Sequence, residues 1–572
     1  MGKTGQPIEA AWAGSRRAAK GSAVILPVLL LAAPVFFLLL FFYFPLGSVL
    51  VGGLTDQSGR FSLGIVAALL GNPYYLKIIG FTVWQAILST LLSVLMGLPG
   101  AYLLARYDFR GKRLIQALTT VPFVLPSIIV VLGFVRFFGN NGVLNRFLAA
   151  LFGLKEPPLK VLYSLQAILL AHAFYNFPIV VRIVSSLWRR IHPSTEEAAR
   201  SLGAHGFRLF WRVTLPQILP GILSAAALVF IFCLLSFAVV LVLGGGPRYS
   251  TLEVEVYRLA KVSLDLKTGS ALSLVGAVIS LVFLYTYIKL QQRSSFAEQM
   301  AEDYERPRLG AMLRSAQGVF YLLYLLLMAV VVLAPMITVV AYSFQARSGW
   351  GQQEVSVEWY RRIFSGGGPY LRAVLNSLFF AVMTTLLSLP LGTVLAYVGS
   401  RSRFAGSQLL EALMMLPIGI SSIILGLGYL KAYQNFPWKI VGSWYAIVFA
   451  HTVIAYPFVI RVASATFRKM KSSLPEAARS LGAGPWQLFW YLELPLARSA
   501  LITGAAFAFG ISVGEINATL MLYNEKLVTI PVMIYRLIGS YNFIGACAMG
   551  SVLMLFCFFA FLIIDRAGGE VG

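Results

Sequence analysis

Apolar segments too long for the core of a globular domain recur along this chain of 572 residues. The first of them, Ser22–Leu50, is almost uncharged and contains VILPVLLLAAPVFFLLLFFYFPLGSVL. A helix of about 20 apolar residues already spans a bilayer. Only 12% of the residues are charged, whereas a soluble domain carries about 25%. The sequence therefore predicts an all-α, polytopic membrane protein.

The first apolar run follows Arg16, Arg17 and Lys20, as the core of a secretory signal peptide would. Such a core is only about 7–15 residues long. The run here is about twice that length, and no clear small-residue cleavage site follows it. We therefore expect a retained first span.

Twelve segments have the length and the apolar character of membrane-spanning helices. They are 22–50, 76–104, 113–138, 163–187, 217–243, 268–290, 316–342, 373–398, 409–433, 443–463, 497–520 and 543–564. The expected fold is therefore a bundle of about twelve membrane helices.

The net charge of +24 raises the question of nucleic-acid binding. Lys and Arg lie, however, in short clusters between the apolar runs, at 106–113, 187–190, 401–403 and 468–471. Basic clusters at the ends of spans mark the cytoplasmic side of a membrane protein, and the sequence has no compact basic domain that would dock on a duplex. Counting the spans from a cytoplasmic N-terminus places all four clusters and both termini in the cytoplasm.

One polar stretch occurs twice. We name EEAARSLGAHGFRLFWRVTLP (Glu196–Pro216) the first elbow and PEAARSLGAGPWQLFWYLELP (Pro475–Pro495) the second elbow. Aligned residues lie 279 positions apart, and the same offset pairs His172 with His451. Twice this offset nearly equals the chain length, and each half holds six predicted spans. The sequence therefore predicts two parallel repeats related by an axis along the membrane normal.

The repeats set the expected domain boundaries. These are a cytoplasmic N-terminal segment (1–21), a first transmembrane domain (22–290), a cytoplasmic linker (291–315), a second transmembrane domain (316–566) and a C-terminal tail (567–572). The linker is predicted from its polar composition, which separates the two apolar halves.

Each elbow is predicted to form short helices outside the bilayer. In the first elbow, Gly203 is a residue type that commonly ends a helix. The segment after it carries Phe207, Leu209, Phe210 and Trp211. An apolar patch exposed to water usually marks an interface, but the spacing alone equally allows a helix that rests on the lipid surface.

The elbows resemble the EAA loop of ABC importer permeases. Both have Glu-Ala-Ala, a glycine four positions after the last alanine, and a final Leu-Pro. The resemblance covers nearly the whole chain. It implies a fused two-domain permease of a type I, binding-protein-dependent importer in a bacterial inner membrane. It also implies two ATPase subunits on the cytoplasmic face and a periplasmic or lipoprotein solute-binding protein.

The same resemblance implies which elbow residues couple the permease to its ATPase subunits. They are Glu197, Ala198, Ala199, Gly203, Phe207, Leu215, Pro216, Glu476, Ala477, Ala478, Gly482, Trp486, Leu494 and Pro495. In this family the loop is a coupling helix that sits in a cleft of the ATPase subunit.

Two further segments narrow the resemblance. Ser236–Arg258, which contains TLEVEVY, and Leu527–Met549, which contains IGSY, resemble fused permeases for thiamine. Fused ferric-iron permeases share the layout and a glycine-rich segment at this place. The resemblance therefore implies thiamine or a related small cation as the solute, with ferric iron as the alternative.

The chain is not expected to be an enzyme. A phosphate-binding loop needs the pattern G-x-x-x-x-G-K-[ST], and Gly2-Lys3-Thr4 has neither the upstream glycine nor a strand before it. We therefore expect no cofactor on this chain, and ATP and Mg on the partner ATPase subunits. The sequence shows neither a nucleophile beside a base nor a pair of carboxylates that would indicate a catalytic site.

Glu515 stands inside a predicted span, where an ionisable group is costly and tends to face a cavity or a partner. In one hypothesis Glu515 and Asn517 line the translocation path, with the repeat mate Ser236 on the other half, and favour a cationic solute. In the other, Glu515 lies near the outer mouth and pairs with a basic residue or backbone amides. The sequence leaves both open.

His172 and His451 are related by the repeat and raise the idea of a metal site on its axis. Four histidines in the whole chain, without carboxylates or thiols beside them, make a poor ligand set. We expect packing or hydrogen bonding instead, and no metal. A secondary transporter with parallel repeats is the competing class, although it needs no ATPase dock.

Overall fold

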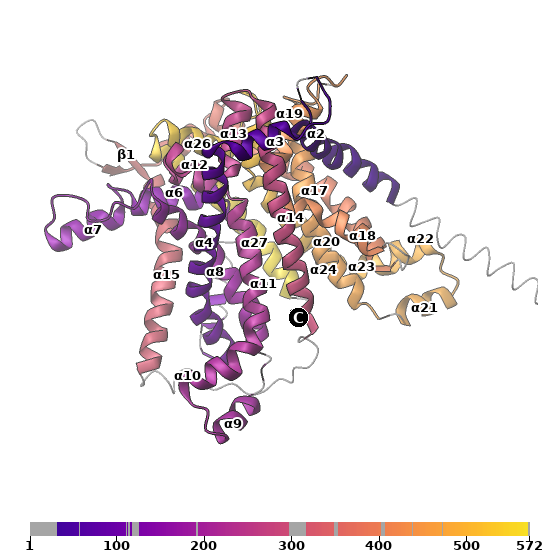
Figure 1. The fold of residues 1–572 in the computed structure, drawn as a ribbon, viewed down its shortest axis with the longest axis horizontal. Helices are drawn as coiled ribbons and strands as arrows, with labels where there is room; N and C mark the ends of the chain where they lie inside the picture. Colours follow the sequence, from indigo (N-terminus) through magenta and orange to yellow (C-terminus); the bar gives the residue numbers. More distant parts are fainter. Residues whose placement is uncertain are drawn as a thin grey trace, which may run out of the picture.

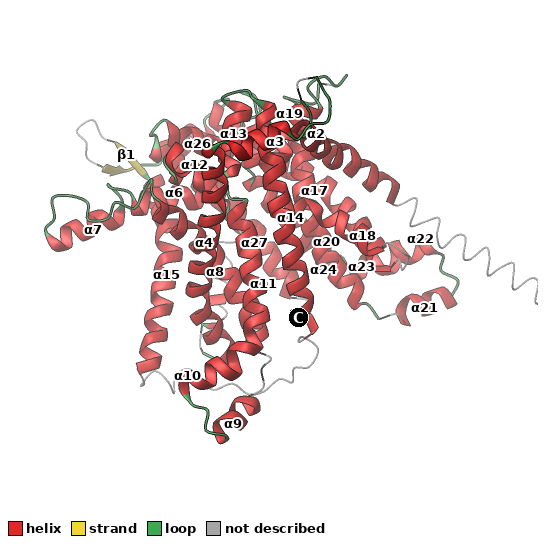
Figure 2. Cartoon of the chain, viewed as in Figure 1, coloured by secondary structure: helices red, strands yellow, loops and turns green. Residues whose placement is uncertain are grey.

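The computed structural model describes residues 31–56, 58–109, 111–112, 115–116, 125–189, 191, 193–296, 316–347, 353–401, 407–437, 439–471 and 473–569. Within them the protein is helical apart from one short antiparallel hairpin of β1 (Gln345–Arg347) and β2 (Gln353–Val355) (Figures 1 and 2). The expected N-terminal segment, most of the linker and the last three residues lie outside the described residues.

The first half contains long helices, which include its predicted spans, and short helices that the sequence analysis did not predict. They are α2 (Phe44–Gly53), α3 (Gly64–Gly71), α4 (Pro73–Arg106), α6 (Ser127–Phe138), α7 (Val143–Phe152), α8 (Leu165–Trp188), α9 (Pro193–Ser201), α10 (Gly206–Leu209), α11 (Leu215–Leu234), α12 (Ala238–Leu243), α13 (Leu252–Lys261) and α14 (Leu266–Phe296). A π-helical segment, Leu39–Tyr43, precedes α2, and another, Phe210–Thr214, joins α10 to α11.

The second half repeats most of this order but has no counterpart of α7 among its described helices. Its helices are α15 (Ala316–Ser343), α16 (Glu358–Phe364), α17 (Pro369–Arg401), α18 (Ser407–Met415), α19 (Ser422–Ala432), α20 (Trp444–Lys469), α21 (Ser473–Ser480), α22 (Pro485–Gln487), α23 (Leu494–Leu496), α24 (Arg498–Gly514), α25 (Asn517–Leu522), α26 (Ile530–Gly539) and α27 (Phe543–Gly569). The π-helical segment Leu488–Glu493 follows α22.

Ten described helices are long and apolar enough to cross a membrane, and twelve spans result if two bent pairs count as one span each. The bent pairs are Leu409–Gly419 with Ser422–Ala432, at 96°, and Pro485–Leu496 with Arg498–Gly514, at 73°. The all-helical, duplicated membrane fold is thereby confirmed. Of the predicted third span, residues 113–114 and 117–124 lie outside the described residues.

Three predicted spans are not continuous helices, and there the prediction was wrong. In the fifth, α11 ends at Leu234 and α12 begins at Ala238; in the eleventh, α24 ends at Gly514 and α25 begins at Asn517. The ninth bends between α18 and α19. Glu515 accepts a hydrogen bond from the amide of Ala518. Broken helices are tolerated at membrane depth where the free backbone groups find partners or line a cavity.

A single offset of 279 holds only for the later part of each repeat. Val180 and Val459 differ by 279, but the glycines that pack against them, Gly97 in α4 and Gly392 in α17, differ by 295. A β-carbon on either glycine would stand 2.7 Å from the β-carbon of its valine, so both positions need glycine for the close helix contact. The offset changes because the first half carries the extra helix α7 between its third and fourth spans.

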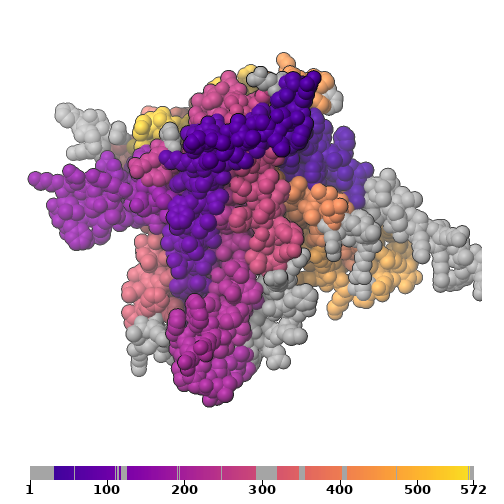
Figure 3. Space-filling model, in the orientation of Figure 1, coloured from indigo at the N-terminus to yellow at the C-terminus, as the bar shows by residue number. Residues whose placement is uncertain are grey.

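The first span of each half packs on the other half. α2 contacts α19 of the second half, and α15 contacts α6 of the first half. Each also contacts the last span of its own half: α2 contacts α14, and α15 contacts α27. The two repeats therefore form one interlocked body, in which α9 and α21 project separately at the end away from α13 and α19 (Figures 1 and 3).

Candidate functional site

Both elbows contain a helix that ends at a left-handed glycine, as predicted. Gly203 has a φ of +84° and Gly482 a φ of +88°. After each of them the chain makes the same pair of backbone bonds, Gly203 N–H to Arg200 at 2.9 Å and Ala204 N–H to Ala199 at 3.0 Å in the first elbow. These bonds satisfy carbonyls that the helix end would leave free. The repeated sequence therefore encodes the same local turn twice.

Each elbow exposes a repeat-related group of apolar side chains. Leu202 is 89% exposed, Phe207 76% and Trp211 58%, and their mates in the second elbow are similarly open. Those mates are Leu481, Trp486 and Trp490. The rings of Phe207 and Trp211 lie 5.7 Å apart, and those of Trp486 and Trp490 lie 5.6 Å apart. Apolar groups held open in this way are typical of a surface that a partner covers.

The structure places the predicted coupling residues on the surface of the elbows. Exposed ones are Glu197, Ala198, Gly203, Phe207, Pro216, Glu476, Ala477, Gly482, Trp486 and Pro495. Half-buried ones are Ala199, Leu215, Ala478 and Leu494. In each elbow, the glutamate and the first alanine of the Glu-Ala-Ala motif are therefore exposed, as is the predicted aromatic residue, Phe207 or Trp486.

Aromatic side chains join each elbow to the membrane helices behind it. In each half, a tyrosine of the second span, an aromatic residue of the fourth span and a phenylalanine of the elbow pack as a triad. The triads are Tyr102, Trp188 and Phe210, and Tyr397, Phe467 and Phe489. Close packing of this kind holds each elbow against the ends of the membrane helices.

An arginine at the end of the second span also binds each elbow, and sequence reasoning missed this contact. Arg106 forms an ion pair with Glu196, which also accepts a hydrogen bond from Thr214 at 2.9 Å. In the second half Arg401 lies 2.8 Å from Glu493. The sequence did contain a signal of this contact, because Arg106 and Arg401 each stand at the end of an apolar span. It was hidden because the carboxylates are not repeat mates: Glu493 stands at the position of Thr214.

Glu493→Gln is expected to destabilise the protein, because the side chain of Glu493 is only 2% exposed and its loss leaves Arg401 without its carboxylate. Removing one partner of a buried pair costs about 3–5 kcal/mol, and Arg401 is 28% exposed, which favours the lower limit. The midpoint of thermal unfolding in detergent measures the effect. Glu411→Gln is the control, since Glu411 and Arg468 form an exposed pair at 2.7 Å. Equal midpoints for the two variants would contradict a role of Glu493 in holding the elbow.

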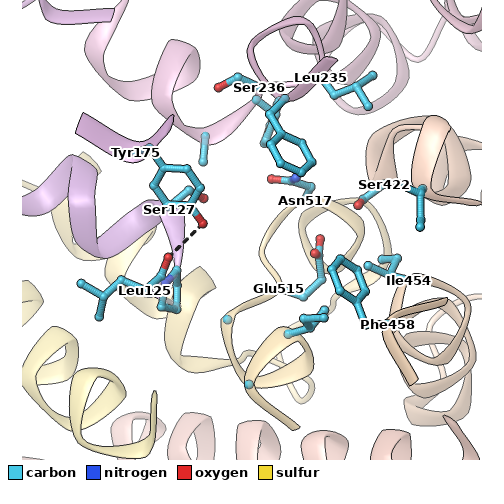
Figure 4. A pocket seen from close by; sticks show the side chains of 18 of the residues that line it. Leu125, Ser127, Tyr175, Leu235, Ser236, Ser422, Ile454, Phe458, Glu515 and Asn517 are labelled. Atoms are coloured by element: carbon cyan, nitrogen blue, oxygen red, sulfur yellow. Dashed lines mark hydrogen bonds between the residues drawn. The ribbon is translucent and has the colours of Figure 1, made fainter. Parts of the chain in front are cut away.

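A cavity of about 350 Å³ lies between the two halves. Its wall comes from α8, α20, α24 and α27, from the breaks between α11 and α12, between α18 and α19 and before α25, and from residues 125–127 at the start of α6. Figure 4 shows Glu515 pointing into this space, with Tyr175 and Ser127 on the facing side. Glu515 is the one carboxylate among the described residues that line it, and Phe458 and Phe507 contribute aromatic wall.

The three residues predicted for the translocation path, Ser236, Glu515 and Asn517, all line this cavity. The hydroxyl of Ser236 bonds the ring of His172 at 2.8 Å. Within the described chain, no lysine or arginine forms an ion pair with Glu515, which accepts the amide of Ala518 at 2.9 Å. The side-chain oxygen of Asn517 is buried and has no hydrogen-bond partner among the described residues. The side-chain oxygens of Glu515 and Asn517 are therefore available to bind a polar solute.

The two histidines of the repeat lie in separate hydrogen-bond networks. His172 bonds Ser89 at 3.0 Å through one ring nitrogen and Ser236 at 2.8 Å through the other. His451 bonds Ser512 at 2.8 Å and Thr519 at 2.9 Å. Each ring therefore connects the fourth span of its half to the helix break beside the cavity.

Duplicated membrane halves, two exposed elbows and a cavity between the halves are typical of a membrane transport component. The chain belongs to the family described as binding-protein-dependent transport system inner membrane component, which matches residues 97–295 and 388–567. It is thus a multi-pass permease of a binding-protein-dependent ABC importer and has no ATPase activity of its own. This membership excludes the alternative of a secondary transporter.

Curated relatives resemble the chain over most of its length. It is 27% identical to the thiamine transport system permease protein ThiP of Haemophilus influenzae, over 87% of this chain and 90% of that protein. Identity to ThiP of Brucella abortus strain 2308 is 28%, over 92% and 93%. The ferric transport system permease protein FbpB of Actinobacillus pleuropneumoniae is 25% identical, over 88% and 73%.

Among solved structures, the chain is similar to a bacterial ABC transporter involved in the import of the acidic polysaccharide alginate. That similarity has a TM-score of 0.39 and 19% identity, and it covers 50% of this chain and 99% of the other.

Proposed function

We propose that this permease imports thiamine or a closely related small aromatic cation. The observation that carries the proposal is the carboxylate of Glu515 in a cavity between the halves that also has aromatic walls. A carboxylate attracts a positive charge, and aromatic faces stabilise a cationic ring. The similarity to ThiP proteins along nearly the whole chain supports the same solute.

In the proposed cycle, a periplasmic or lipoprotein binding protein delivers the solute to the face opposite the elbows, and both chain termini lie in the cytoplasm. Two ATPase subunits, which carry ATP and Mg, bind the exposed apolar groups of the two elbows. Their closure draws the elbows together. The aromatic triads and the pairs of Arg106 and Arg401 pass this movement to the membrane helices, so that the cavity opens to one side and then to the other.

Ferric iron is the second candidate, favoured by the similarity to FbpB. The described cavity wall offers a single carboxylate. Hard cations are usually held by several oxygen ligands, so the wall suits an organic cation better than a bare ferric ion.

ATP-dependent uptake distinguishes the two solutes. The permease, its ATPase subunits and its binding protein are reconstituted in vesicles, and labelled thiamine and labelled ferric iron are supplied in parallel. We expect uptake of thiamine that stops without ATP and without the binding protein. Uptake of ferric iron alone would refute the proposed solute and leave the family assignment in place.

A further inference from the structure

The TLEVEVY segment forms α13, a short helix between the fifth and sixth spans of the first half. It lies at the end of the molecule away from the elbows (Figure 1), and it is not one of the candidate spans. Its first amide, Leu252 N–H, donates to Thr82 of α4 at 2.9 Å. The repeat mate α26 has the same anchor, from Ile530 N–H to Ser377 at 2.8 Å. Each short helix is therefore fixed to its own half.

α13 also packs across the molecule, against α19 of the second half. Glu253 is 3% exposed in this contact, and its carboxylate accepts a hydrogen bond from the hydroxyl of Ser421. Ser421 caps α19, since its oxygen also accepts the amide of Ile423 at 3.1 Å. Ser421 and its neighbour Ser422 line the cavity. The bond therefore crosses between the halves at the wall of the cavity.

Glu253 has a buried carboxylate that pairs with no lysine or arginine among the residues that the structure describes. The other ionisable groups on α13 and on α4, α14 and α19, which pack against it, with Asp265 just before α14, are Tyr74, Tyr75, Lys77, Tyr102, Arg106, Glu255, Tyr257, Arg258, Lys261, Asp265, Lys267, Tyr285, Tyr287, Lys289, Tyr429 and Lys431. In the described chain none of these bonds Glu253; Glu255 pairs with Arg258 at 2.5 Å, and Lys431 bonds Ser270 at 3.3 Å. Burial raises the pKa of Glu253 to about 8, and the bond from Ser421 lowers it by less.

The bond between a buried carboxylate and a serine occurs at only one of the two repeat-related contacts between the halves. α26 packs on α6 in the way that α13 packs on α19. Alignment of the two anchor residues, Leu252 and Ile530, places Pro531 at the position of Glu253, and the offset of 295 places Pro126 at the position of Ser421. A polar contact on one side and prolines on the other show that the repeated fold does not itself require a carboxylate here. An uncompensated buried carboxylate costs free energy and is a candidate for a functional role.

We propose that Glu253 and Ser421 form a latch between the halves that holds the outer end of the cavity closed and releases when water reaches the carboxylate. The outer position of this end rests on the proposed docking of ATPase subunits at the elbows. In the closed state the carboxyl group is protonated and buried. Opening separates α13 from α19 and hydrates the group, which then ionises.

The latch makes opening depend on pH in a defined direction. The open state has an ordinary glutamate pKa near 4.5, and the closed state has the raised value of about 8. The closed state is therefore favoured at low pH, and it loses stability relative to the open state as pH rises from about 4.5 to about 8. Between pH 6 and pH 8 the ratio of open to closed molecules should rise by about tenfold or more.

Distances between spin labels on the two halves test this inference. Cysteines replace the exposed Val262, just after α13, and the exposed Asn435, just after α19; the three native cysteines are buried. In the assembled transporter without ATP, we expect a longer distance component that grows between pH 6 and pH 8. Glu253→Gln should abolish this growth, and Ser421→Ala should increase the longer component at every pH.

Glu255→Gln is the matched control, because Glu255 lies two positions away on the same helix and pairs with Arg258 of its own half. It should keep the pH response. A pH response that survives Glu253→Gln, or unchanged distances in Ser421→Ala, would overturn the latch. The measurement does not depend on which solute is carried, so failure of the proposed solute and failure of the latch are distinguishable.

Discussion

Replacing Gly203 and Gly482 together with aspartate is expected to give a permease that folds and inserts but no longer binds its ATPase subunits. Both glycines have positive φ, and an added β-carbon at either would meet no atom within 4 Å. The substitution therefore strains only the local backbone, by about 1–2 kcal/mol. It also places a charge in the proposed docking surface, where none of the described residues balances it. Together these effects should weaken ATPase binding by more than about tenfold, which corresponds to more than about 1.4 kcal/mol.

Co-purification of the ATPase subunits in mild detergent, with uptake into vesicles, measures this loss. Each single variant leaves one elbow intact and should lose only part of the activity. The double asparagine variant is the control, because asparagine tolerates positive φ and carries no charge, so it should retain most binding. Full ATPase recovery and normal uptake in the double aspartate variant would mean that the elbows do not couple the two components.

Glu515→Gln is expected to lower uptake of a cationic solute by about tenfold, which corresponds to about 1.4 kcal/mol. The variant removes the carboxylate that the described cavity wall presents, yet glutamine can still accept the amide bond that Ala518 donates. The helix break should therefore keep its shape. Uptake at subsaturating solute, with ATPase co-purification to verify assembly, separates a loss of transport from a loss of structure.

Glu525→Gln is the control for this experiment. Glu525 lies between α25 and α26, is exposed and pairs with Arg536 at 2.7 Å, so it carries the same charge outside the cavity. Its loss should leave uptake close to that of the unmodified protein. If Glu515→Gln transports thiamine normally, the carboxylate serves only to cap the helix break, and the solute does not depend on it.

The sequence alone determined those features that depend on local composition. Apolar runs of more than about 20 residues locate membrane helices whatever they pack against, and most predicted spans coincide with described helices. The described third, fifth and eleventh spans, however, begin at Ser127, Gly206 and Pro485, more than ten residues from the predicted starts. The duplication and the glycine turns of the elbows could likewise be predicted from the order of residues alone. Gly203 and Gly482 adopt the predicted conformation because a helix that ends in a left-handed residue needs glycine there.

The tertiary structure decided which parts meet. No spacing rule indicates that α2 packs on the opposite half, that Arg401 binds Glu493, or that Glu253 bonds Ser421 across 168 positions of sequence. The helix breaks beside Ser236 and Glu515 were also hidden in apolar runs that resemble continuous spans. Periodicity shows which face of a helix is apolar, but many helices in a membrane protein share such faces. Only close packing and the pairing of buried polar groups select one partner among them.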